Sequence, residues 1–196
     1  MSTPLPKLAA PLAPLLPRLD LEAGAAAALG GAQTAADGIE QLEAQGFRNE
    51  AVRLAAHALP KREAVWWACM CAAAVPDPAL PGADAAARAA AEAWVRKPAD
   101  EPLRRAAWDA AQKTAFSSPE AWSAVGAFWS GGSMSPDGQP VVPPAEHLTG
   151  LAVSGAVVMA AVRGHPERAD ARFGRFLAAA RDIAAGGAGR VDPESD

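Results

Sequence analysis

The sequence has no tyrosine, two cysteines and few β-branched residues outside 151–162. The scarcity of β-branched residues, with no stretch that alternates at period two, argues against a sheet-based fold. The two cysteines stand in a Cys-x-Cys arrangement, which is too little for a disulfide scaffold. Positive charge is not in excess, because the formal net charge is −4. Neither nucleic acid nor an anionic membrane surface is therefore an expected partner.

A long uninterrupted apolar run is also missing. The most apolar segment, 148–162, contains Gly150, Ser154 and Gly155 and is shorter than the roughly 20 residues that cross a bilayer. We expect it to be a buried core helix and predict no membrane span. Five prolines within residues 1–17 break the apolar helix that an export signal needs, so a cytoplasmic location is expected.

Alanine, a strong helix former, dominates what is present. At 196 residues the chain fits one domain. We predict an all-α, single-domain multi-helix bundle of about seven or eight helices, partly built of helical hairpins like those of HEAT and TPR repeats. No second copy of such a unit recurs along the chain, so a solenoid is not predicted. The expected parts are a Pro/Ala/Gly-rich tail and weak helix (1–36), a helical domain (37–186) and a disordered acidic tail (187–196).

The helix that starts at Pro60 is expected to be central. Proline suits a first helical turn, but Lys61 and Arg62 then lie at the positive end of the helix dipole and call for a partner outside this helix. Trp66 and Trp67 follow and point about 100° apart, because a helix has about 3.6 residues per turn. Both can be buried only if the helix is covered on more than one side.

The longest irregular connection after the tail is the loop 130–144, rich in glycine and proline. Loops of this length in compact domains are often functional. Its start, Trp129-Ser130-Gly131-Gly132-Ser133, matches neither a phosphate-binding loop nor a serine-nucleophile motif, and no strand precedes it. A helix end followed by a glycine turn explains it better.

Candidate catalytic groups are scattered. Cys69 and Cys71 lie about 200° apart on a helix, so they can neither form a disulfide with each other nor chelate one metal ion. We expect both to be buried structural thiols. The three histidines, at 57, 147 and 165, lack metal-type spacing. We therefore predict no metal site and no cofactor, and an enzyme is the less favoured interpretation.

Two stretches are similar to a known family: Leu59-Pro60-Lys61-Arg62-Glu63-Ala64-Val65-Trp66-Trp67-Ala68-Cys69, and Phe128 to Met134 followed by Val142-Pro143-Pro144 and His147-Leu148-Thr149. They resemble an uncharacterised, alanine-rich bacterial domain-of-unknown-function family with a proline, a basic pair and a double tryptophan before a cysteine. The likeness covers roughly residues 37–185. It implies an accessory or adaptor role at type VI secretion loci and assigns no catalytic residue.

We expect a non-catalytic protein-interaction module, of adaptor or chaperone-like type, because exposed aromatic and arginine residues anchor protein interfaces. A secretion effector or secretion component is the partner that the resemblance implies. The candidate contact residues are Lys61, Arg62, Trp66, Trp67, Trp129 and Met134. One alternative is an enzyme or ligand-binding protein with a pocket between the Trp67 helix and the 130–144 loop, using Cys69, Ser133 and His147. Another is a structural protein that buries the same patch in a homodimer.

Overall fold

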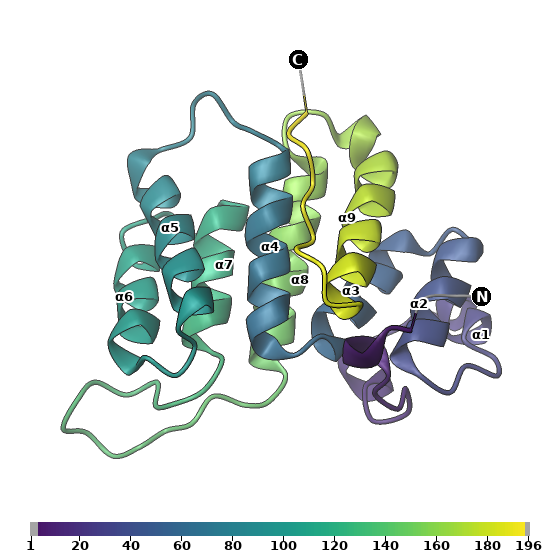
Figure 1. Cartoon of the computed structure of the whole chain (residues 1–196), viewed down its shortest axis with the longest axis horizontal. Coiled ribbons are helices and arrows are strands. Elements are labelled where there is room, and N and C mark those ends of the chain that lie inside the picture. The colour runs from purple at the N-terminus through teal and green to yellow at the C-terminus, as the bar shows by residue number, and fades with distance from the viewer. Residues whose placement is uncertain (1–3, 195–196) are drawn as a thin grey trace.

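The computed structural model describes residues 4–194, and within them the protein is helical without a strand (Figure 1). This confirms the predicted all-α single domain. The α-helices are α1 (Ala23–Ala28), α2 (Ala35–Ala44), α3 (Arg48–Ala58), α4 (Lys61–Ala74), α5 (Gly82–Arg96), α6 (Glu101–Ala111), α7 (Pro119–Phe128), α8 (Leu148–Val162) and α9 (Ala169–Ala184). Three short 3-10 helices lie at Pro6–Leu8, Leu16–Arg18 and Pro166–Arg168.

Polar caps fix where several helices begin. Asp100 accepts a hydrogen bond from the Leu103 N–H before α6, and the Ser118 hydroxyl does the same for α7, as N-cap residues do. Thr34 and Asp37 form a reciprocal capping box at α2. Helix α2 ends at Ala44, and Gly46, just beyond its C-cap, has a φ of 84° that glycine adopts at little cost.

Helices α4 and α8 form the middle of the molecule. Helix α8 packs against α7, α3 and α4, and α4 also contacts α5, α7 and α9. Helices α5–α7 lie on one side of this centre and α1–α3 on the other (Figure 1). Trp67 has no exposed surface, and its indole N–H donates to the Phe176 carbonyl oxygen at 2.8 Å. Helices α3 and α4 share few contacts, since α3 packs mainly on α2, α8 and α9, so the Pro60 junction is a corner.

The N-terminal segment, expected as a loose tail, contributes to the core. Leu8, Leu12, Leu15 and Leu19 are buried, whereas Leu16 is partly exposed. Burying an aliphatic side chain contributes about 1.5–3 kcal/mol, which orders a proline-rich segment that has little helix of its own. Residues 1–3 of this tail lie outside the described part of the chain.

At the other end, residues 186–194, here called the C-terminal arm, have no helix and run back along α4 beside α9 (Figure 1). This segment was expected to be disordered, and the last two residues of that prediction, 195 and 196, lie outside the described part. The arm borders two pockets. Within residues 4–194, no single helix combines the length and apolarity of a membrane span; α8 and α9 pass that test only as a pair bent by 113°.

Candidate functional site

The basic pair at the start of α4 has partners inside the chain. The Lys61 ammonium donates to the Ser130 carbonyl oxygen at 3.1 Å, just beyond α7, and the Arg62 Nε donates to the Val95 carbonyl oxygen at 2.8 Å, in the last turn of α5. Both acceptors belong to helix C-terminal ends, where cations are favoured by the helix dipole. The unfavourable position of these cations on α4 is therefore offset by two neighbouring helices, without an external partner.

The two tryptophans of α4 differ in exposure. Trp67 is wholly inside the core, so it does not reach a surface partner. Trp66 is half-buried, and its indole N–H donates to the Ala188 carbonyl oxygen of the C-terminal arm at 2.8 Å. This difference agrees with the 100° separation, because Trp67 points toward α9, whereas Trp66 points toward a space bordered by the arm, by Val95 of α5 and by Ile183 of α9.

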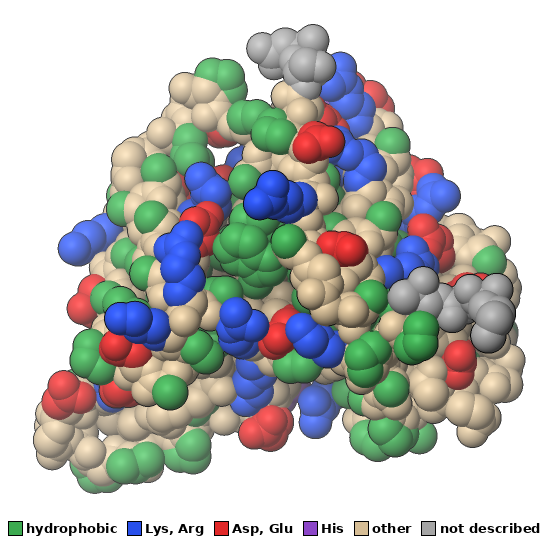
Figure 2. All heavy atoms as spheres, in the orientation of Figure 1, with side chains coloured by type: hydrophobic (Ala, Val, Ile, Leu, Met, Phe, Trp, Pro, Cys, Tyr) green, Lys and Arg blue, Asp and Glu red, His purple; other side chains and the backbone are tan. Residues whose placement is uncertain are grey.

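Beside Trp66 lies a pocket of about 330 Å³, here called the Trp66 pocket. Its lining residues are Lys7, Arg62, Glu63, Trp66, Val95, Arg96, Ile183, Gly186, Gly187 and Ala188. Lys7 contacts the Glu63 carboxylate at 3.0 Å, and Arg62 contacts it at 3.3 Å. Burial raises the pKa of Glu63, but the hydrogen bond from Lys7, the hydrogen bond from the Glu63 backbone N–H and the charges of Lys7 and Arg62 together hold it below the ordinary value. Figure 2 shows hydrophobic atoms over α4 with Lys and Arg side chains on both sides.

The 130–144 loop is tied to α6 by two arginines. Arg104 donates to the carbonyl oxygens of Phe128 and Ser133, and Arg105 donates to that of Ser135 at 2.7 Å. The Ser133 hydroxyl accepts the backbone N–H of Val142 at 3.1 Å, and the Met134 N–H donates to the Val142 carbonyl oxygen. Met134 and Trp129 are half-buried, and the Trp129 ring lies edge-on to Trp122. The loop is an ordered element, with Val141 and Val142 exposed.

The three residues of the alternative pocket lie in different surroundings. Cys69 is fully buried in α4. The Ser133 hydroxyl accepts hydrogen bonds from the N–H groups of Ser135 and Val142 within the loop. His147 is exposed at the start of α8. No hydrogen bond of residues 4–194 joins any two of them. Burial raises the pKa of the Cys69 thiol to about 12 and that of the Cys71 thiol well above its ordinary value, so neither is a thiolate at neutral pH.

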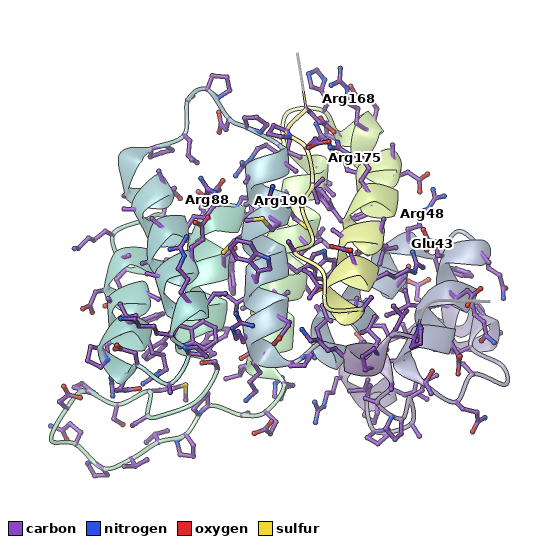
Figure 3. All side chains as sticks on the ribbon, in the orientation of Figure 1. Glu43, Arg48, Arg88, Arg168, Arg175 and Arg190 are labelled. Carbon is purple, nitrogen blue, oxygen red and sulfur yellow. The ribbon has the colours of Figure 1, made fainter. Side chains whose placement is uncertain are left out.

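A second pocket of about 320 Å³ lies between the end of α4 and the start of α9. Arg172, of which 2% is exposed, and Arg175 both bind the Glu194 carboxylate of the arm, at 2.8 and 3.0 Å, and Arg168 lies 3.7 Å from it (Figure 3, where Arg168 and Arg175 are labelled). We call this cluster the arginine pocket. The hydrogen bonds from Arg172 chiefly hold the pKa of Glu194 below its ordinary value, against the opposing effect of burial. Arg163, on the same rim, pairs instead with the buried Glu120.

Residues 4–194 contain no group of three or more His, Cys, Asp or Glu side chains that could hold a metal ion.

Comparison with known proteins places the chain in a family of unknown function. The model of a family of unknown function, DUF6931, matches residues 38–184, which is most of the chain. The chain belongs to the DUF6931 family. This confirms the predicted resemblance at the level of an uncharacterised domain. Curated proteins and solved structures gave no significant match.

The family match contains both pockets except for their borders with residues outside 38–184, namely Lys7 and the arm. The sequence alone does not show that Arg168, Arg172 and Arg175 converge on one carboxylate. Arg168 directly precedes α9, and the spacing of four and three residues places Arg172 and Arg175 on the same side of that helix. That spacing, together with an acidic segment downstream, was the available signal.

Proposed function

We propose that this DUF6931 protein is a protein-interaction module whose contact surface is centred on the Trp66 pocket. The observation that carries the proposal is a half-buried tryptophan beside a cavity bordered by Lys7, Arg62 and Arg96. Tryptophan and arginine are the residue types most enriched among the residues that dominate binding energy at interfaces. The apolar floor would bury a partner side chain, and the cations would contact acidic or carbonyl groups around it.

We choose the principal contacts by side-chain exposure and by existing bonds. The side chain of Arg96 is 66% exposed, and its ion pair with Glu92, at 3.6 Å, is long. The side chain of Arg62 is 48% exposed, although its Nε is bound to Val95. We therefore propose Arg96 and Trp66 as the principal contacts, while Lys61 serves mainly to hold α7 and α4 together. As a finer proposal, which rests on the resemblance of the sequence motifs alone, the partner is a type VI secretion component or effector.

The test uses charge reversal at the pocket rim. Tagged full-length protein is used to capture partners from its native lysate, with wild type, Arg96→Glu, and Lys97→Glu as the matched control. Lys97 is exposed next to Arg96 but does not line the pocket. A photo-crosslinking residue in place of Arg96, compared with one in place of Lys97, then shows whether the captured protein touches the rim.

We expect one protein to be captured by wild type and Lys97→Glu, to be lost with Arg96→Glu, and to crosslink from position 96 only. Equal capture by all three variants would overturn the proposal. If the crosslinked partner is a second copy of this chain, the module is self-associating. Substituting Lys61 and Arg62 would be a poorer test, because their hydrogen bonds to neighbouring helices make a folding defect the expected result.

A further inference from the structure

The arginine pocket is a built site whose central cation is held independently of the arm. The Arg172 Nη1 donates to the carbonyl oxygens of Ala161, Arg163 and His165, at 2.8, 2.7 and 3.3 Å. These carbonyls belong to the end of α8 and the turn that follows it. They fix the guanidinium so that its Nε and Nη2 face the Glu194 carboxylate. The remaining donors thus form the two-pronged arrangement that binds carboxylates.

Glu194 is bound as a ligand would be. Its carboxylate receives two nitrogens of Arg172 and one of Arg175, at 2.8–3.1 Å. Its backbone N–H donates to the Ala74 carbonyl oxygen, at the end of α4, at 2.9 Å. The pocket therefore contacts both a carboxylate and a main-chain N–H, and an extended peptide supplies both groups.

The charges in the pocket are not balanced by the arm. Among the ion pairs of residues 4–194, Arg168, Arg172 and Arg175 contact one carboxylate, that of Glu194. Asp77 also borders the pocket, so the three arginines face two carboxylates and one positive charge remains in excess. Beside Glu194 the pocket still holds about 320 Å³, bordered by Pro76, Pro78 and His165. A ligand with more than one acidic group would use this space and this charge better than the arm does.

The arm has no regular structure and is held by single hydrogen bonds and one half-buried side chain. Between α9 and Glu194 these are the Trp66 bond to the Ala188 carbonyl oxygen, the bonds from the Gly187 and Gly189 N–H groups to Asp182, the bond from Arg175 to the Asp192 carbonyl oxygen, and the packing of Val191 against the core. A peptide that offers the same groups can replace it. Gly189 has a φ of 62°, and a Cβ at this position would overlap Ile183. The position of the arm against α9 therefore requires a glycine here.

We propose that the arginine pocket binds an extended acidic peptide of a partner protein, and that the C-terminal arm is an intramolecular substitute which the peptide displaces. The inference goes beyond the proposed function and can fail separately from it. The Trp66 pocket depends on Arg96 and Trp66, whereas the arginine pocket depends on Arg168, Arg172 and Arg175. The arm borders both pockets, so its release would also open one side of the Trp66 pocket.

The experiment measures fluorescence anisotropy of a labelled peptide with the sequence of residues 188–194, blocked at both ends, added to the full-length protein. The proteins are wild type, Glu194→Gln, Asp192→Asn as the matched control, and Glu194→Gln combined with Arg168→Ala and Arg175→Ala. Asp192 lies on the arm, but its side chain is exposed. Gly189→Val is a second route to release that leaves every pocket residue intact. Unlabelled peptide and inorganic phosphate serve as competitors.

The C-terminal arm is a tethered competitor, which acts at an effective concentration on the order of millimolar. Release of the arm in Glu194→Gln and Gly189→Val should therefore tighten the binding of the labelled peptide at least about tenfold. Asp192→Asn should bind as wild type does, and the triple variant should lose the gain. Equal affinity in wild type and both released variants, or undiminished binding by the triple variant, would overturn the proposal. Displacement by phosphate as effective as that by unlabelled peptide would also overturn it, since the site would then recognise an anion rather than a peptide.

Discussion

Replacement of Arg104 by methionine should loosen the 130–144 loop and destabilise the whole domain. The side chain of Arg104 is 4% exposed and lies with its guanidinium 4.6 Å from the centre of the Phe128 ring. It donates to the Phe128 and Ser133 carbonyl oxygens and forms two bonds of 2.6 Å with the Glu101 carboxylate. One side chain therefore connects α6, the end of α7 and the loop.

The size of the effect follows from what methionine leaves behind. Methionine keeps the apolar stem against Phe128 but leaves two carbonyl oxygens without their charged donor, and hydrogen bonds to charged groups contribute about 1.5–3 kcal/mol each. Glu101 is half exposed and can be hydrated, so its loss adds little. We expect a decrease of about 3–4 kcal/mol in the free energy of unfolding, which lies at the lower end of the range for breaking a buried ion pair.

Arg105→Met is the matched control, because Arg105 binds the same loop through Ser135 but its side chain is 22% exposed. Exposed ion pairs contribute about 0–1 kcal/mol. Urea unfolding, followed by tryptophan fluorescence, gives both values, and amide hydrogen exchange over 130–144 reports the loop. If Arg104→Met lies within 1 kcal/mol of Arg105→Met, with unchanged exchange in the loop, the loop is not held as we describe.

Two further predictions concern His57 and the helix that covers it. Gly150→Ala should destabilise the protein by about 1–3 kcal/mol, because a Cβ at position 150 would overlap the His57 ring. Gly155→Ala, on the same helix, places its Cβ in open space and should stabilise the protein by about 0.4–1 kcal/mol. Thermal unfolding of the two variants compares them directly, and equal effects would contradict the packing argument. Burial, with smaller contributions from Arg18, His147 and Arg53, lowers the pKa of His57 from 6.5 to about 4. The neutral His57 ring therefore contributes its full stability above pH 6.5, and this contribution is lost as the pH falls from 6.5 toward 4. Urea titrations at pH 7.5 and 5 should show a smaller decrease for His57→Gln than for wild type, and identical decreases would refute this assignment.

The helices were predictable where local chemistry specifies them. Asp100 and Ser118 mark the starts of α6 and α7 because a side-chain oxygen three residues before a free N–H is a local signal. The capping box at Thr34 carries the same kind of signal. The residues that bring the pockets together were not predictable, because Arg172 and Glu194 are 22 positions apart and meet only through the fold. No periodicity in the sequence encodes such a contact.

The cations of this protein separate into two classes by what satisfies them. Lys61 and Arg62 are in unfavourable positions on their own helix, which suggested an external partner, yet the ends of α7 and α5 supply their acceptors. Arg168 and Arg175 are in unremarkable positions in the sequence, and there the fold leaves positive charge in excess of the available carboxylates. A conflict within one helix is thus weak evidence for a binding surface, because neighbouring helices can resolve it. A surplus of charge that remains after every described contact is counted is stronger evidence, since folding leaves it for a ligand to balance.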